Sequence, residues 1–395
     1  MTALDKDTVI GVVGAGAMGT GIAQVALARG HRVLLTDAHP PAVTGACEAL
    51  RAALEREAEK GRLSRDEATA AIERLTGVAP TEGLGTFAQC GLVIEAIVEQ
   101  LEVKRETFRA LEQVVAPDAV LATNTSSLSV ASIAGACEHP ERVLGLHFFN
   151  PAPVMPLVEI VGAVRTAPDV LTASRALVDG WGKITVLAAD TPGFIVNRVA
   201  RPFYGESLRI LEDGLADAPT IDWALRELGG FRMGPFLLMD FIGHDVNYAV
   251  TESVWTALYF DARYRPSITQ KRLVEAGWLG RKSGRGFYDY SPDAPPRPAT
   301  EDRELGQRIV HRVVSMLINE AVDAVHHRIA SPEAIELAMT KGVNYPRGLL
   351  AWGQELGFDA VLTEIERLRE ESGDERYRPS PLLRRLARSG ERLVP

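Results

Sequence analysis

A glycine-rich turn near the start of the chain is the feature that most constrains its fold. The segment "VIGVVGAGAMGTGIAQVALARGHRVLLTD", residues 9–37, reads as a strand, a turn, a helix and a second strand that ends in an acid. Gly14, Gly16 and Gly19 form the pattern G-x-G-x-x-G. These glycines permit a tight turn, a close approach of the backbone to a pyrophosphate, and close packing of the helix on the strand. The helix points its N-terminal N–H groups at the phosphates, so the segment predicts a dinucleotide-binding unit.

The acid at the end of the second strand indicates which dinucleotide is bound. Asp37 stands at the distance from the glycines where a carboxylate can bind the ribose hydroxyls. That carboxylate would repel an adenosine 2′-phosphate, and no arginine follows it directly. The segment therefore favours NAD over NADP, while FAD stays possible from this stretch alone.

The first half of the chain alternates strand-like and helix-like patterns. Apolar runs such as "GLVIEAIV" and "VLATNTS" are separated by patterned stretches such as "EVKRETFRALEQVV" as far as about residue 186. This alternation is typical of a parallel sheet with crossover helices. We therefore predict an α/β Rossmann-type doubly wound domain over residues 1–189, followed by a region in which helical patterns dominate.

The helical region contains an internal repeat. The sequence "IVNR" at residues 195–198 recurs as "IVHR" at 309–312, an offset of 114 residues, and further matches keep that offset almost without gaps. Such a register indicates duplication. The proline-rich "SPDAPPRPATEDRE" between the copies predicts a linker. We expect two tandem all-α domains, residues 190–290 and a degenerate second copy at 305–395, joined by a linker over 291–304.

Charge and cysteine content exclude several classes of protein. The formal net charge is −9, so we expect no binding to nucleic acid or to an anionic membrane. The three cysteines form no CxxC pair, which argues against a structural zinc site and a disulfide framework. No apolar run reaches the length of a membrane span, and the first eight residues are too short for a targeting peptide. We expect a cytoplasmic protein with no metal site.

A histidine and a glutamate form the candidate acid–base pair. Removing hydride from an alcohol needs a base for the hydroxyl proton, and a histidine oriented by an acid is suited to that task. His147 follows the apolar run "RVLGL", at the predicted carboxyl end of a strand, where α/β proteins form their sites. Glu159 lies within the apolar "LVEIV" and needs a partner there. An antiparallel return of the chain would join them, but spacing alone leaves open a structural histidine beside an unrelated acid.

Other polar residues follow neighbouring predicted strands. The stretch "TNTSS", residues 123–127, closes one strand, and Glu99 and Lys104 follow "VIEAI". Asn197 opens the first helical domain. Each has a structural alternative, because the serines can cap a helix, the charged pair can lie on a solvated helix start, and the asparagine can be a cap or a core residue.

Together these motifs resemble the L-3-hydroxyacyl-CoA dehydrogenase family, including the 3-hydroxybutyryl-CoA dehydrogenases. The family's order and spacing are matched by "GAGAMGTGIA", "EAIVEQLEVK", "NTSSL", "GLHFFNPAPVM", "LVEIV", "DTPGFIVNR" and "GRKSGRGFYDY", so the resemblance covers nearly the whole chain. It implies a reversible, NAD-dependent oxidation of (S)-3-hydroxyacyl-CoA to 3-oxoacyl-CoA, with an acyl-CoA as the substrate.

The resemblance also implies roles for single residues. His147 is similar to the family's catalytic base and Glu159 to its orienting partner. Ser126 and Asn197 are similar to the residues that hydrogen-bond the substrate, and Asn150 to an asparagine that lies near the glutamate. The family's cofactor-contacting positions are matched by Gly14, Gly16, Met18, Gly19, Asp37, Glu99, Lys104 and Asn124.

Two basic residues match the family's helical positions near the CoA. Arg56 and Lys60 stand four residues apart, so a helix would place them on one face, and CoA phosphates need cations. A solvated helix face is the alternative for such a pair. The sequence departs from many relatives at Pro156, where they carry a lysine, which puts a CoA or backbone contact at that position in doubt.

The second helical copy carries His311 where the first has Asn197, so we expect it not to bind substrate. A tandem copy can bury within one chain the face that shorter relatives use to dimerise. We therefore expect a monomer built as an internal pseudo-dimer, or a homodimer. A sugar-acid dehydrogenase of the L-gulonate type on the same scaffold is the alternative function. The acyl chain length and the pathway, whether fatty-acid β-oxidation, aromatic-acid breakdown or polyester synthesis, are not indicated.

Overall fold

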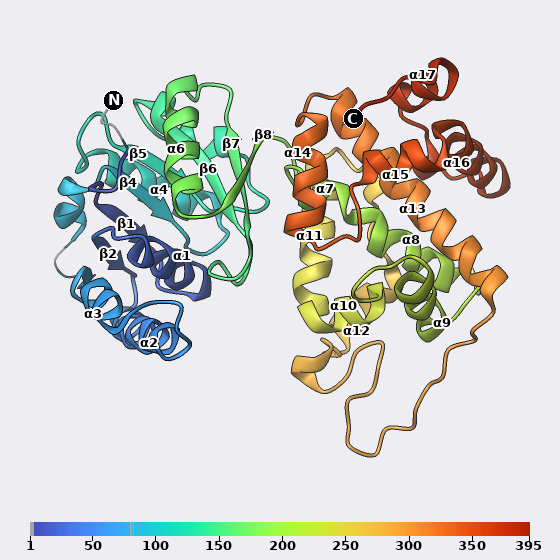
Figure 1. Cartoon of the computed structure of the whole chain (residues 1–395), viewed down its shortest axis with the longest axis horizontal. Helices are drawn as coiled ribbons and strands as arrows, with labels where there is room; N and C mark the ends of the chain where they lie inside the picture. Colours follow the sequence, from blue (N-terminus) through green and yellow to red (C-terminus); the bar gives the residue numbers. More distant parts are fainter. Residues whose placement is uncertain (1–3, 80, 82) are drawn as a thin grey trace. The chain divides into compact units, whose positions relative to one another are not determined.

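The structure is a computed structural model that describes residues 4–79, 81 and 83–395 (Figure 1). The chain forms two compact units, Met1–Thr191 and Pro192–Pro395, which are described separately. No helix within the described residues is both long enough and apolar enough to cross a membrane. The cytoplasmic location stays a prediction.

The N-terminal unit is built on one eight-stranded sheet with the order β3-β2-β1-β4-β5-β6-β7-β8. Neighbouring strands are parallel except for the antiparallel pair β6 and β7. The order reverses between β1 and β4, the switch point at which α/β sheets bind ligands. The strands are β1 Ile10–Val13, β2 Val33–Thr36, β3 Leu75–Val78, β4 Leu92–Glu95, β5 Val120–Thr123, β6 Val143–Phe148, β7 Leu157–Gly162 and β8 Ile184–Ala189.

Helices connect and cover these strands, as Figure 1 shows. The central strands are buried along their whole length, because crossover helices shield a parallel sheet from water. This confirms the predicted Rossmann-type doubly wound fold. The helices are α1 Ala17–Ala28, α2 Pro40–Glu59, α3 Arg65–Glu73, α4 Leu101–Glu112, α5 Val130–Ala134 and α6 Pro168–Gly180, with the short 3-10 segments η2 Leu84–Gln89 and η3 Pro140–Arg142.

Two strands of the sheet, β3 and β8, were not predicted from the sequence. They lie at its two ends, and each has partly or fully exposed positions. An end strand has a neighbour on one side only and can carry polar or small exposed residues, as β3 does with Thr76 and Gly77, whereas β8 is largely apolar. The apolar-run criterion detected the six inner strands and missed the outer two.

The C-terminal unit is helical and contains two runs of elements in the same order. The first run is α7 Val196–Val199, α8 Arg201–Glu212, α9 Ala218–Trp223, η4 Ala224–Leu228, α10 Pro235–Ile242, α11 His244–Ala257, η5 Ala262–Tyr264, α12 Ile268–Glu275 and η6 Arg281–Ser283. The second is α13 Arg303–His326, α14 Pro332–Leu337, η7 Ala338–Gly342, α15 Leu349–Leu356, α16 Phe358–Ser372, η8 Glu375–Tyr377 and α17 Pro381–Ser389.

The two runs repeat in unusual detail. The rare π-helical turns η4 and η7 begin 114 residues apart, at Ala224 and Ala338, and α10 and α15 keep the same offset. The long helix α13 stands where the first run has α7 and α8. The repetition supports the predicted duplication, and both runs belong to one compact unit. The exact limits 190–290, 291–304 and 305–395 remain predictions.

Reciprocal ion pairs join the two runs. Arg198 Nε lies 2.8 Å from Glu320 Oε1, and Arg312 Nε lies 2.5 Å from Glu206 Oε1. Each arginine and each glutamate is related to its counterpart by the offset of 114 residues, so the contact is made twice with the roles exchanged. Self-complementary exchange of this kind is what a two-fold interface between identical subunits produces.

Candidate active site

The glycine turn between β1 and α1 has the steric requirements that its sequence predicts. Gly14 has a φ of 111°, and a Cβ there would lie 2.3 Å from the carbonyl oxygen of Ala96. A Cβ on Gly19 would lie 1.8 Å from the carbonyl oxygen of Gly14. A Cβ on Gly16 would meet nothing within 4 Å. The turn therefore needs two glycines for its own fold and leaves open space at Gly16, beside the N-terminus of α1, where a pyrophosphate fits.

The acid after β2 is held against this turn. The carboxylate of Asp37 accepts hydrogen bonds from the backbone N–H of Ala15, at 2.8 Å, and of His39, at 2.9 Å. These bonds place the carboxylate beside the open side of Gly16. Met18, in the first turn of α1, is half-buried and packs against the core of the unit.

A buried charge cluster lies beyond β4. The ammonium of Lys104 lies 2.6 Å from Glu95 Oε1 and 3.2 Å from Glu99 Oε2, and the lysine side chain is almost completely buried. Glu95 also accepts from the Thr123 hydroxyl at 2.7 Å, which ties β4 to β5. Lys104 thus joins two carboxylates, and a buried cation of this kind is stable only when it is paired.

Glu99 in turn organises the loop that follows β5. Its Oε1 accepts hydrogen bonds from the hydroxyls of Thr125 and Ser127, at 2.6 and 2.9 Å, and from the backbone N–H of Ser126. Burial raises the pKa of Glu99, but the attraction of Lys104 and these hydrogen bonds outweigh it, so the pKa lies below its usual value. The carboxylate is therefore ionised at neutral pH.

His147 and Glu159 are in contact on the antiparallel strands β6 and β7. The two residues are directly opposite in the register, and His147 Nδ1 lies 2.5 Å from Glu159 Oε2. Glu159 is fully buried and His147 is nearly so. The predicted antiparallel return of the chain is present. The Phe149 ring also packs on the imidazole, with the ring centroids 4.5 Å apart.

Asn124 and Ser126 lie on the loop after β5, next to the strand that carries His147. The Asn124 side-chain oxygen accepts from the backbone N–H of Phe148 at 2.9 Å, which joins this loop to the end of β6. Asn150 is exposed after β6. The unit thus brings the glycine turn, Glu99, the serine loop and the histidine to the carboxyl edge of one sheet.

The remaining predicted site residues lie elsewhere. Arg56 and Lys60 are exposed at the C-terminal end of α2, and Lys60 lies 3.8 Å from Glu57. Asn197 lies in α7 of the helical unit, so its place in the site stays a prediction. Pro156 precedes β7, and its carbonyl accepts from the N–H of Ile184 at 2.8 Å.

The sequence reasoning missed two residues that support the site. Glu95 is the deeper partner of Lys104, and it could have been found as a carboxylate inside the apolar "LVIE". Lys183 donates to the carbonyl oxygens of Ala152 and Met155, at 2.6 and 2.8 Å, and so holds the loop between β6 and β7. Burial, with repulsion from Arg29, lowers the pKa of Lys183 to about 8.

Comparison with known proteins identifies the family of the chain. The sequence model of the 3-hydroxyacyl-CoA dehydrogenase NAD binding domain matches residues 9–191, and that of the C-terminal domain of the same enzymes matches residues 193–290 and again 309–392. The chain belongs to the 3-hydroxyacyl-CoA dehydrogenase family. It is an NAD-dependent oxidoreductase that oxidises hydroxyacyl-CoA.

Several relatives are similar over most of their length. The 3-hydroxyadipyl-CoA dehydrogenase of Escherichia coli is 38% identical, covering 96% of this chain and 97% of the relative. A probable 3-hydroxybutyryl-CoA dehydrogenase of Bacillus subtilis is 40% identical, covering 71% of this chain and 96% of the relative. A crystal structure of 3-hydroxybutyryl-CoA dehydrogenase from E. coli has a TM-score of 0.91 at 38% identity, covering 96% of this chain and 98% of that one.

Proposed function

We propose that the protein interconverts (S)-3-hydroxyacyl-CoA and 3-oxoacyl-CoA, with His147 as the general base. The observation that carries this proposal is the contact between His147 Nδ1 and Glu159 at the carboxyl edge of the sheet. With Nδ1 engaged, Nε2 is the nitrogen that takes the proton from the 3-hydroxyl group. The glycine turn, with Gly16 and Asp37, would hold NAD, and the bound cofactor would supply the hydride acceptor for C3. The reverse reaction returns the proton from Nε2 to the 3-oxygen.

Glu159 keeps the base in its working form. A carboxylate on Nδ1 fixes the tautomer in which Nε2 is free of a proton, and it stabilises the imidazolium that forms after proton transfer. Full burial strengthens this attraction because little water screens the pair. The contact thus favours proton uptake at the atom that faces the substrate.

We further assign Ser126 and Asn197 to the substrate, where they donate hydrogen bonds to oxygen atoms that gain charge. Asp37 and Asn124 line the cofactor side, together with Glu99 held by Lys104. The exposed Arg56 and Lys60 on α2 suit the CoA phosphates, and Asn150 suits the substrate side of the pair.

We propose that one chain takes the place of a homodimer. The reciprocal buried pairs, Arg198 with Glu320 and Arg312 with Glu206, support this because they join the two helical runs as two subunits would be joined. Light scattering coupled to gel filtration tests it. A mass near 42.8 kDa is the expected result, and a mass of twice that value would contradict it.

The assay of function is NADH oxidation by the purified protein with acetoacetyl-CoA, repeated with free acetoacetate. Turnover of the thioester alone is expected. Turnover of neither substrate by protein that still binds NADH would contradict the proposal and favour a sugar-acid substrate. A parallel assay with 3-oxoadipyl-CoA asks which acyl group is preferred, because the names of the E. coli relative and of the E. coli crystal structure specify acyl groups that differ in length and in a terminal carboxylate.

A further inference from the structure

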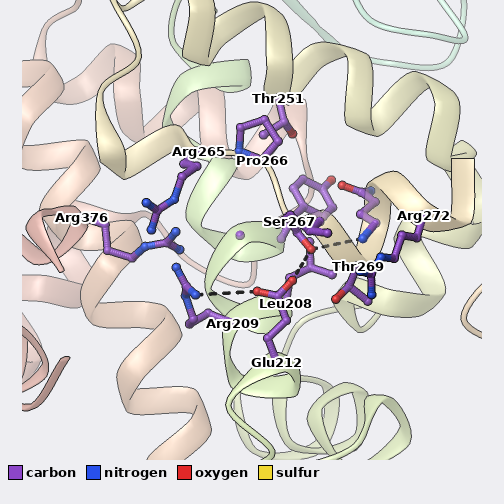
Figure 2. Close-up of a pocket in the computed structure, with 14 residues that line it drawn as sticks. Leu208, Arg209, Glu212, Thr251, Arg265, Pro266, Ser267, Thr269, Arg272 and Arg376 are labelled. Atoms are coloured by element: carbon purple, nitrogen blue, oxygen red, sulfur yellow. Dashed lines mark hydrogen bonds and ion pairs between the residues drawn. The ribbon is translucent and has the colours of Figure 1, made fainter. Parts of the chain in front are cut away.

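A cavity of about 450 Å³ in the helical unit is lined by residues to which the proposed reaction assigns no role. It lies between α8, the segment before α12 and the start of α12, with Arg376 of the second run on its wall. Figure 2 shows the guanidinium groups of Arg209, Arg265 and Arg376 turned toward one another around it. Arg272 lines the side near Ser267 and Thr269.

The cavity carries an excess of positive charge. Three of its arginines share one carboxylate oxygen, since Asp374 Oδ2 lies 2.8 Å from Arg265, 3.2 Å from Arg209 and 3.3 Å from Arg376. Glu212 is the one acid among the lining residues. Asp374 and Glu212 offset two of the four arginine charges, so the cavity keeps a net positive charge that a bound anion would offset.

The equivalent place in the second helical run is balanced. At the offset of 114 residues, Arg209 corresponds to Asp323. Asp323 pairs with Arg263 at 3.0 Å and with Arg198 at 3.2 Å. Arg263 is itself the counterpart of Arg376 in the repeated "RYRPS". The duplication thus has an acid, Asp323, in one half where the other half has a further cation, Arg209.

The same comparison explains why the cavity is hollow. Gly205 lines it, and the counterpart of Gly205 is Asn319. Asn319 is fully buried; its amide donates to the carbonyl of Arg378 at 3.1 Å, and its side-chain oxygen accepts from the N–H of Ser380 at 2.8 Å. A Cβ on Gly205 would meet nothing within 4 Å. The space that an asparagine fills in one half is therefore open in the other.

The walls of the two places differ in polarity as well. The cavity is lined by Thr251, Thr269 and Gln270, whereas the matching positions in the second run are the buried apolar Ile365, Leu382 and Leu383. Behind Thr251, the buried Arg201 donates to its hydroxyl at 3.1 Å, and within the described residues no carboxylate pairs with that guanidinium. Arg201 adds to the positive field.

We propose that this cavity binds a small polyanionic metabolite, one that carries a phosphate group or several carboxylates with at least two negative charges. Arginine forks bind such groups through paired, charge-assisted hydrogen bonds. The hydroxyl and amide groups of the wall supply further donors. None of the residues assigned above to the acyl-CoA reaction lines this cavity.

Calorimetric titration of the full chain tests the proposal, with NAD present at saturation so that the cofactor site cannot take the probe. The probes are inorganic pyrophosphate and citrate. We expect one of them to bind with a submillimolar Kd. Gly205→Asn, which places the side chain of the second run in the cavity, and Arg209→Gln should each weaken binding at least tenfold. Arg388→Gln changes the charge equally on the exposed end of α17 and should leave binding unchanged.

Each result decides the question. Binding of pyrophosphate alone supports a phosphorylated ligand, and binding of citrate alone supports a polycarboxylate. Absence of binding by both probes at millimolar concentration would overturn the proposal, and so would equal binding by the wild type and both cavity variants. If thermal melting shows Gly205→Asn to be unfolded, Arg209→Gln and Arg272→Gln decide in its place.

Discussion

Two buried histidine–carboxylate pairs occur among the residues that the structure describes, one in each unit. His147 and Glu159 are 2.5 Å apart in the sheet, and His244 and Asp240 are 2.6 Å apart in the helical unit. Both carboxylates are completely buried. By distance and burial the pairs are nearly the same, so neither quantity says which of them does chemistry.

Their surroundings differ. Asp240 also accepts from the backbone N–H groups of Phe287 and Tyr288, at 2.9 and 3.0 Å. A Cβ on Gly280 or Gly286 would lie 2.2 or 2.1 Å from atoms of Asp240. The carboxylate therefore ties the segment "GRKSGRGFYDY" to α10, and the glycines of that segment make room for it.

His147 instead stands at the edge of a parallel sheet, beside the loops that the glycine turn and Glu99 organise. The comparison teaches that a histidine–carboxylate contact acquires its role from its place in the fold. In the proposed function the pair at the carboxyl edge of the sheet accepts a proton, whereas the pair among packed helices links two segments of the chain.

The largest expected effect comes from His147→Gln. The amide cannot take the hydroxyl proton, so kcat should fall about 10²–10⁴-fold, while NADH binding and the melting temperature stay close to those of the wild type. Steady-state assays and thermal melting measure both. His244→Gln is the matched control, expected to lower the melting temperature and to spare kcat. Equal losses of kcat in the two variants would refute the division of roles.

Asp240→Asn should give the largest loss of stability. It removes the charge from a buried pair and weakens two backbone hydrogen bonds, so the free energy of unfolding should fall by about 3–5 kcal/mol. Urea unfolding followed by circular dichroism measures it. Glu159→Gln is the counterpart in the sheet, and it should lower kcat more than it lowers stability. A wild-type urea midpoint for Asp240→Asn would contradict the structural role.

Two substitutions in the glycine turn should separate an effect on cofactor binding, in Gly16→Ala, from an effect on folding, in Gly14→Ala. A methyl group on Gly16 enters open space and should weaken NAD binding about tenfold, equivalent to about 1.4 kcal/mol, without a change in melting temperature. Gly14→Ala should instead destabilise the unit, because of its φ of 111° and its contact with Ala96. Fluorescence titration with NADH checks both variants. Unchanged NADH affinity in Gly16→Ala would place the pyrophosphate elsewhere.

Glu99→Gln should give the smallest effect on stability, and that effect should depend on pH. Because the folded-state pKa of Glu99 is lowered, its contribution is complete above the ordinary pKa of 4.5 and is lost as pH falls through the folded value. The variant should be less stable than the wild type by a few °C at pH 7, and the difference should shrink toward acid. Thermal melting between pH 3 and pH 7 measures this. A difference that grows toward acid would contradict it.

The sequence predicted much of the fold because its signals are local. The glycine turn, the alternation of strands and helices and the repeat at 114 residues all follow from neighbouring residues in the chain. The end strand β3 was missed because its exposed Thr76 and Gly77 interrupt the apolar pattern, whereas β8, "ITVLAA", is largely apolar and was not recognised as a strand.

The site was predicted in part. Four residues could be selected because each follows or interrupts an apolar run, where a polar group is costly to bury unless it has a partner or a function: His147, Glu159, Asp37 and Glu99. The roles of Glu95 and Lys183 were not foreseen. Each depends on a partner that only folding brings close, Lys104 for one and the carbonyl oxygens of the β6–β7 loop for the other.

By itself, the sequence determined the class of fold, the cofactor and the candidate base, because steric limits on glycine and the cost of burying charge act on single positions. Only the tertiary structure decided which histidine–carboxylate pair stands at the edge of the sheet. It also decided that one half of a duplicated domain is filled by Asn319 and that the other is hollow and positively charged. Such differences depend on contacts between distant segments, and those contacts exist only once the chain is folded.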